Sequence, residues 1–81
     1  MKVAYSKRFL ESYAEATPEV QRAADRRIVL LLQNLRHPSL RAKKYDEARG
    51  IWQARVNRAW RFYFRIEEDT YYLVDIISHP K

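Results

Sequence analysis

Arginine supplies the charge in one stretch of this chain that contains no acid. The stretch runs from residue 48 to residue 66, and its cationic residues are Arg49, Arg55, Arg58, Arg61 and Arg65. A planar guanidinium group can bind an oxyanion through two parallel hydrogen bonds, which a lysine ammonium cannot do. The acids gather on either side, at Asp46–Glu47 and Glu67–Asp69. Composition alone therefore fits two interpretations, a phosphate-binding surface or a solvated strand face beside acidic turns.

The remaining composition excludes several kinds of site. The 81 residues include no cysteine, two histidines and one glycine, so we expect no disulfide, metal site, glycine-rich phosphate loop or cofactor. Sixteen Lys/Arg against ten Asp/Glu give a net charge of +6, and 14% of the residues are aromatic. No apolar run reaches the ~18 residues of a membrane span, and the first residues do not have the pattern of a signal peptide. We expect a cytoplasmic protein with a nucleic-acid partner and no membrane partner.

Two helices are predicted to follow a short first strand. Lys2–Tyr5 alternates in polarity, as strands do, and Ser6 is a favourable N-cap for a helix over residues 7–16. Thr17-Pro18-Glu19 is a strong signal for the start of a second helix, with threonine as the N-cap and proline in the first turn. This helix is expected to end at about Leu35 or Arg36.

The period of the apolar residues changes to two in the second half. His37 precedes Pro38, where the helix must end, so we expect His37 to cap that end or to lie on the surface. Pro38 to Gly50 has the composition of a polar connection. Apolar and polar residues then alternate in three segments, Trp52–Val56, Trp60–Ile66 and Tyr72–Ile76. Short polar turns join these segments, which predicts an antiparallel meander.

The order strand–helix–helix–strand–strand–strand predicts an α+β fold. The most economical architecture packs the two N-terminal helices on one face of a small, mostly antiparallel four-stranded sheet. No repeat, low-complexity segment or internal boundary divides the chain, so we expect a single domain over residues 1–81.

The two predicted turns determine which strand residues face each other. A turn at Asn57-Arg58-Ala59 pairs Trp52 with Phe64, Ala54 with Phe62, Gln53 with Tyr63 and Arg55 with Arg61. A turn at Glu68-Asp69-Thr70 pairs Phe62 with Ile76, Phe64 with Val74 and Tyr63 with Asp75. The helix-free face is then expected to hold Gln53, Arg55, Arg61, Tyr63, Arg65 and Asp75, together with Tyr71, Leu73 and Ile77.

The predicted opposition of Arg55 and Arg61 would destabilise the sheet locally. Like charges in direct opposition destabilise a sheet by a few tenths to ~1 kcal/mol. Asp75 offers a structural remedy by pairing with Arg61, and a bound phosphate offers a functional one; the residues alone favour neither. Tyr63 adds an aromatic ring to this face, which could stack on a base.

An ordered set of motifs resembles one known family. The motifs are His37-Pro38-Ser39-Leu40-Arg41-Ala42-Lys43-Lys44, Ile51-Trp52-Gln53-Ala54-Arg55-Val56-Asn57, Trp60-Arg61-Phe62 and Asp75-Ile76-Ile77-Ser78-His79. With the order of elements, they resemble the RelE/ParE superfamily of bacterial type II toxin–antitoxin toxins over nearly the whole chain. The resemblance implies a small microbial-ribonuclease-like α+β sheet and a toxin neutralised by a cognate antitoxin. Many members cut mRNA in the ribosomal A site, whereas the ParE branch poisons DNA gyrase.

The resemblance also implies roles for residues on the basic strands. By position, Arg61 matches the strand arginine that contacts the scissile phosphate in the nuclease branch. Arg55 matches a basic strand position used for substrate contact. The other residues expected to bind RNA or its phosphates are Lys43, Lys44, Tyr63 and Arg65.

His79 falls where nuclease members place a C-terminal histidine or arginine. Metal-free RNA cleavage needs a base for the 2′-hydroxyl, a group that stabilises the phosphorane charge, and an acid for the leaving 5′-oxygen. Arg61 can stabilise the charge but stays protonated, so it cannot be the base. His79, with a reference pKa near ~6.5, is the expected general acid. Lys44, Asp75 and a ribosomal group all remain open as the base.

One feature of the nuclease members is missing. Several of them add an aromatic residue beyond the C-terminal histidine or arginine, whereas only Pro80 and Lys81 follow His79 here.

The expected function is the toxin of a type II system, a metal-independent mRNA endoribonuclease that inhibits translation on the ribosome. The alternatives are a ParE-type poison of DNA gyrase without nuclease activity, and a non-toxic superfamily member that only binds antitoxin or RNA.

Overall fold

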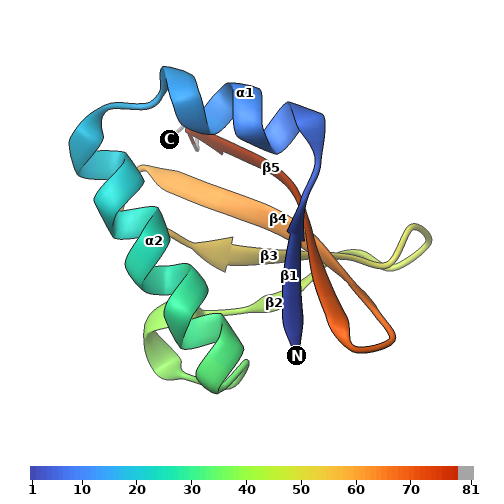
Figure 1. Cartoon of the computed structure of the whole chain (residues 1–81). Coiled ribbons are helices and arrows are strands. Elements are labelled where there is room, and N and C mark those ends of the chain that lie inside the picture. The colour runs from blue at the N-terminus through green and yellow to red at the C-terminus, as the bar shows by residue number, and fades with distance from the viewer. Residues whose placement is uncertain (79–81) are drawn as a thin grey trace.

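Two helices cover one face of a five-stranded sheet in the computed structural model, which describes residues 1–78 (Figure 1). The elements in chain order are β1 (Lys2–Tyr5), α1 (Lys7–Glu15), α2 (Pro18–Gln33), the 3₁₀ helix η1 (Pro38–Leu40), β2 (Lys43–Asp46), β3 (Ile51–Arg55), β4 (Trp60–Glu67) and β5 (Thr70–Ser78). The strand order is β1-β5-β4-β3-β2. β1 runs parallel to β5, and the other neighbouring strands are antiparallel. None of the described helices is long and apolar enough to cross a membrane.

Both helices begin at the N-caps that the sequence predicts. The Ser6 hydroxyl accepts a hydrogen bond from the Phe9 N–H at 2.9 Å and donates one to the Val74 carbonyl at 2.7 Å. It therefore starts α1 and ties the helix to β5. The Thr17 hydroxyl accepts from the Val20 N–H at 3.2 Å, with proline in the first turn of α2. These side chains satisfy N–H groups that have no partner within the helix.

The end of α2 differs from the prediction. The helix stops at Gln33, two or three residues early, because Asn34 turns to an extended conformation while its N–H still reaches the Leu30 carbonyl at 2.7 Å. His37 does not cap this helix. Its Nδ1 instead accepts from the Ser39 N–H at 3.1 Å and caps the start of η1.

The prediction of four strands was wrong, because the sheet has a fifth strand in the expected polar connection. β2 is an edge strand paired antiparallel with β3, with Lys43 opposite Gln53 and Lys44 opposite Trp52. It has no buried side chain, so its sequence lacks the apolar alternation that reveals a half-buried strand. The register shifts at Tyr45, and such irregularities are common on sheet edges.

A second register shift, in β5, changes which residues face the helices. The pairing across β3 and β4 is as predicted, and so are the pairs of Phe62 with Ile76 and of Tyr63 with Asp75. The predicted pair of Phe64 with Val74 was wrong: Phe64 pairs with Leu73, and Val74 is the extra residue of a bulge. A slip of one residue moves every following side chain to the other face. Leu73 (0% exposed) and Tyr71 (6%) therefore lie in the core and not on the helix-free face.

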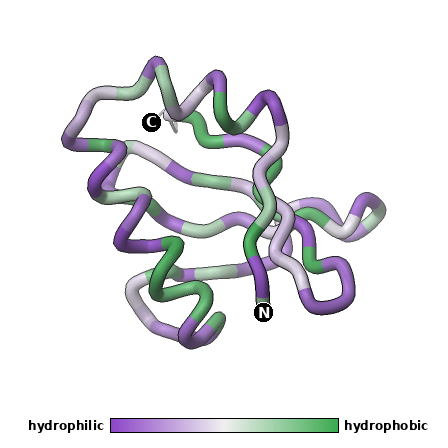
Figure 2. Tube along the Cα trace, in the orientation of Figure 1, coloured by the Kyte–Doolittle hydropathy of each residue, from purple (hydrophilic) through white to green (hydrophobic). Residues whose placement is uncertain are grey.

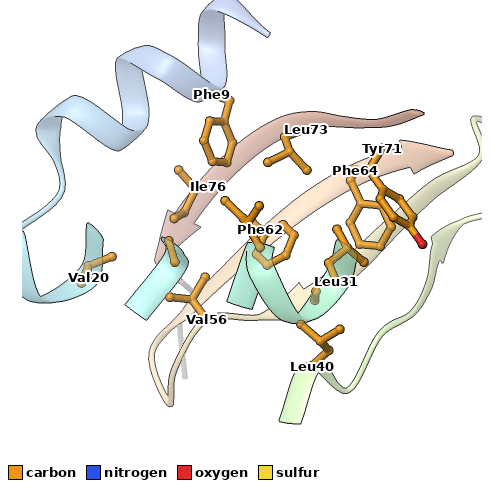
Figure 3. Packing of buried hydrophobic residues seen from close by; sticks show 13 residues of the cluster. Phe9, Val20, Leu31, Leu40, Val56, Phe62, Phe64, Tyr71, Leu73 and Ile76 are labelled. Carbon is orange, nitrogen blue, oxygen red and sulfur yellow. The ribbon is translucent and has the colours of Figure 1, made fainter. Parts of the chain in front are cut away.

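The core lies between the two helices and the sheet (Figure 3). Its largest fully buried side chains come from α1, α2, η1 and the strands: Phe9, Leu31, Leu40, Phe62, Phe64, Leu73 and Ile76. Burying each such side chain contributes roughly 1.5–3 kcal/mol. Polar and apolar residues alternate along α2 and give way to an apolar run over residues 28–32 (Figure 2). This packing fixes β3 and β4, whose other face the two helices do not cover.

Candidate phosphate-binding site

A depression of about 250 Å³ lies beside the paired strands β2, β3 and β4. Its lining consists of Arg41, Lys43, Gln53, Arg55 and Arg61. β2 contributes Lys43, β3 contributes Gln53 and Arg55, β4 contributes Arg61, and Arg41 follows η1. Four of the five lining side chains are cationic and none is acidic. We call this depression the basic pocket.

The β3–β4 turn holds Arg61 in place. Arg61 Nη1 donates to the Asn57 carbonyl at 2.7 Å and to the Trp60 carbonyl at 2.9 Å. Asn57 Oδ1 in turn accepts from the N–H groups of Ala59 and Trp60, both at 2.9 Å. The turn is thus fixed by its own asparagine and fixes one end of the guanidinium. Within residues 1–78, the Nε and Nη2 donors of Arg61 have no hydrogen-bond partner in the protein.

Arg55 stands at the centre of the positive charge. It lies directly opposite Arg61 across the two strands, as the sequence predicts. Partial burial lowers the pKa of Arg55, and the charges of Arg41, Arg61, Arg27 and Arg58 lower it further. The side chain stays protonated in any case. A bound anion would relieve this mutual repulsion.

Asp75 does not neutralise Arg61, so the structural remedy considered from the sequence is wrong. Asp75 Oδ1 accepts from the Ser12 hydroxyl at 2.7 Å and from the Ile76 N–H at 2.8 Å, and Oδ2 lies 3.0 Å from Arg8 Nε. These contacts tie β5 to α1. They leave the Arg55–Arg61 pair without a carboxylate among the residues that the structure describes.

The two adjacent lysines of β2 are separated by the pleat of the strand. Lys43 faces the same side as Gln53 and lines the basic pocket. Lys44 is opposite Trp52, and its Nζ lies 5.5 Å from the centre of the indole ring. Lys44 therefore takes part in a cation–π contact on the other face and does not reach the pocket.

Tyr63 and Arg65 lie farther along β4 and do not line the basic pocket. Tyr63 is only 9% exposed, and its ring meets that of Tyr45 at 4.9 Å between centres, whereas Tyr45 is 62% exposed. Burial raises the pKa of the Tyr63 phenol, with a further rise from Tyr45. Arg65 Nε lies 3.0 Å from Glu67 Oε2, without hydrogen-bond geometry, and the guanidinium covers the Tyr72 ring at 5.2 Å.

His79 lies outside the described residues. The described part of β5 ends at Ser78, which is opposite Trp60, and the preceding Ile77 is opposite Arg61. Within the described residues, the end of β5 therefore lies beside the start of β4.

Three arginines near the basic pocket, Arg27, Arg41 and Arg58, were not among the residues expected to bind phosphate, although Arg58 belongs to the acid-free stretch. A second depression, of about 430 Å³, is lined by Arg27, Pro38, Ser39, Arg41, Arg55, Asn57 and Arg58. The unusual position of Arg27 could have been recognised in the sequence. It is a charged residue on the apolar stripe of α2, four residues before Leu31 and three after Ala24. The position of Arg41 could not, since it depends on η1 and on a left-handed backbone conformation (φ 47°, ψ 42°).

Solved structures share the fold of this chain over almost its whole length. No protein-family model and no curated protein matches the sequence. A YoeB/ParE toxin from Agrobacterium tumefaciens superposes with a TM-score of 0.81 at 13% identity, covering 99% of this chain and 100% of its own. The isolated RelE toxin of E. coli gives 0.74 at 8% identity, covering 99% and 85%. The RelB–RelE antitoxin–toxin complex of Methanococcus jannaschii gives 0.77 at 13% identity, covering 93% and 88%.

The fold is that of the RelE/ParE toxin superfamily. At 8–13% identity this similarity shows a shared fold and does not assign an activity. The fold expected from the resemblance is confirmed apart from the strand count.

Proposed function

We propose that this protein is the toxin of a bacterial type II toxin–antitoxin system and a metal-independent endoribonuclease that cuts mRNA on the ribosome. The observation that carries the proposal is the basic pocket, where Arg55 and Arg61 oppose each other with no carboxylate in the lining. A phosphodiester is the anion that would offset this charge. The RelE/ParE-like fold supports the same conclusion, because other chains with this fold are toxins.

The proposed reaction is attack of a ribose 2′-oxygen on the adjacent phosphorus. A 2′-O–P bond forms and the P–O5′ bond breaks, which leaves a 2′,3′-cyclic phosphate and a free 5′-hydroxyl. Arg61 and Arg55 bind the non-bridging oxygens and stabilise the charge that develops on them. Donors fixed in advance, as Arg61 is by the β3–β4 turn, need no reorganisation during the reaction. His79 gives its proton to the leaving 5′-oxygen.

Neither residue considered from the sequence as the base for the 2′-hydroxyl is placed at the basic pocket. Lys44 lies against Trp52 on the other face of the sheet, and Asp75 is bound by Arg8 and Ser12. Neither lines the basic pocket. These positions favour the third possibility, a group supplied by the ribosome.

A cognate antitoxin is the proposed protein partner. The RelE of M. jannaschii is seen with its antitoxin RelB. This chain has a net charge of +6, and its helices expose the apolar side chains Leu10, Val29 and Leu32. A partner that is both acidic and amphipathic would match these features. The product of the neighbouring small gene should therefore bind the purified protein, and failure of any neighbour to bind would count against a toxin–antitoxin pair.

The decisive experiment is induction of the protein in bacteria, with growth and mRNA integrity as readouts. We expect growth arrest and new mRNA ends carrying a 5′-hydroxyl, both lost in Arg61→Ala and His79→Ala. Arg22→Ala, an exposed position on α2, serves as the matched control and should stay toxic. If growth stops while mRNA stays intact, and DNA breaks and an SOS response appear, the protein would instead be a gyrase poison. Wild-type protein that does not arrest growth would indicate a non-toxic member that only binds antitoxin or RNA.

A further inference from the structure

The second depression adjoins the basic pocket and has no role in the proposed reaction. Arg41 and Arg55 line both, so the two form one continuous basic surface. Beyond these shared residues, the second depression contributes Arg27 and Arg58. Its lining holds four arginines and no acid. A surface of this kind suits a second anion next to the first.

Arg27 is a cation fixed by the fold. It comes from α2, and its Nε donates to the Val56 carbonyl at 3.1 Å, while its Nη1 donates to the Ser39 carbonyl at 3.3 Å. The guanidinium therefore connects α2 with the end of β3 and with η1. No ion pair to Arg27 occurs among residues 1–78. A guanidinium held this way loses little conformational entropy when its remaining N–H groups bind an anion.

Arg41 is held between the two depressions by a strained backbone. Its φ of 47° lies in the left-handed region, which costs a residue with a side chain of order 1–3 kcal/mol. The Arg41 N–H bonds to the Pro38 carbonyl at 3.2 Å and closes η1. This left-handed conformation sets the Arg41 side chain at the boundary of the two depressions, in spite of its cost.

We infer that the protein binds two successive phosphates of one RNA strand, the scissile phosphate in the basic pocket and its neighbour in the second depression. This inference rests on the proposed function and specifies its substrate as a strand with at least two phosphates. Arg27 and Arg58 bind the neighbouring phosphate, and Arg41 and Arg55 lie between the two. Contacts of this kind read the backbone and not the bases, so they position the strand without selecting its sequence.

The test measures binding of short 2′-O-methyl oligonucleotides with one, two or three phosphates by fluorescence anisotropy. The methyl group blocks the attacking 2′-oxygen, so the ligands are not cut. We expect affinity to rise about tenfold from one phosphate to two, and less from two to three. The slope of log affinity against log salt should steepen by ~0.7 for the added phosphate of a single strand. Equal affinity for one and two phosphates would overturn the inference.

Substitutions distinguish phosphate binding at the second depression from a general effect of the protein's net charge. Arg58→Ala removes an exposed side chain and should abolish most of the tenfold gain, while the one-phosphate ligand binds as before. Arg27→Ala should do the same, with its folding checked by circular dichroism because Arg27 also bonds to the main chain. Arg22→Ala is the control for loss of one charge and should keep the full gain. If Arg58→Ala keeps it too, the second depression does not bind phosphate.

The binding test can fail or succeed independently of the cleavage test. Protein that shows the two-phosphate gain but leaves mRNA intact in cells would contradict the endoribonuclease proposal alone. Protein that cuts mRNA but shows no gain would contradict the subsite alone. A third outcome would point to a protein partner for this surface. In that outcome the two-phosphate ligand binds no more tightly than the one-phosphate ligand, and an acidic peptide displaces both equally.

Discussion

Arg61 and Arg65 stand on the same strand and in the same phase of its pleat, yet they have different surroundings. Arg61 is bonded to the main-chain carbonyls of its turn and lies opposite Arg55. Arg65 lies 3.0 Å from Glu67 and covers the Tyr72 ring. Residue type and strand phase therefore do not by themselves assign a role. What separates the two arginines is whether a carboxylate lies within reach.

The largest expected effect is at Arg61. Arg61→Ala should lower the rate of ribosome-dependent mRNA cleavage about 10²–10³-fold, the usual cost of removing one donor that stabilises a developing oxyanion. Arg61→Lys should restore only part of this, because an ammonium keeps the charge but loses the two-pronged geometry. The rate is measured on ribosomes with purified protein. An alanine variant within threefold of wild type would remove Arg61 from the mechanism.

A carboxylate introduced near Arg61 should neutralise that arginine, as Glu67 does for Arg65. Gln53 lines the basic pocket and is 9% exposed. Gln53→Glu should weaken RNA binding about tenfold and raise the unfolding free energy by about 1 kcal/mol, the size of the like-charge repulsion it offsets. Urea unfolding and anisotropy measure the two effects, with Gln53→Met as the uncharged control. An unfolding free energy no higher for Gln53→Glu than for Gln53→Met would mean that the arginines are not under electrostatic strain.

The third prediction concerns Arg65 itself. Its ion pair with Glu67 is about half exposed, with side-chain exposures of 41% and 56%, and lacks hydrogen-bond geometry, so it should contribute little. We expect Arg65→Ala to lower the unfolding free energy by about 0.5–1 kcal/mol, including the contact with Tyr72, and to leave cleavage within twofold. Urea unfolding and the ribosome assay measure these. A tenfold loss of RNA binding would instead support the substrate role first expected for Arg65.

The smallest expected effect is at Tyr63, which lies between the two arginines. Burial raises the pKa of its phenol in the folded protein, so above pH ~10 the unfolded chain releases this proton first. Its contribution to stability is therefore intact below that pH and is lost as the pH rises through the folded-state pKa. Tyr63→Phe should give a shallower alkaline decline in unfolding free energy than the wild type. An unchanged slope would show that Tyr63 does not contribute to it.

The sequence predicts the Arg55–Arg61 pair because two local rules agree there. Asn57-Arg58-Ala59 signals a turn, and the alternation on either side fixes the register. The helix starts at Ser6 and Thr17 are equally local, since each depends on one side chain and one N–H three residues later.

The features that were missed depend on contacts between distant residues. The bulge at Val74 leaves no mark in the hydropathy pattern, yet it sends Leu73 into the core. Asp75 finds its partners on α1, 63 residues away in the case of Ser12, which the strand register cannot reveal. Lys43 was expected at the site, but its separation from Lys44 required knowing that β2 is a strand.

The parallel pairing of the first and last strands has a consequence for synthesis of the chain. β1 has β5 as its only neighbour in the described sheet, and the Ser6 hydroxyl bonds to a carbonyl 68 residues later. β5 also supplies the partners of Phe62 and Phe64. Contacts this distant in sequence are slow to form, because the chain between them must first be brought together. A nascent chain that has not released residues 70–78 from the ribosome therefore has an incomplete core behind Arg61.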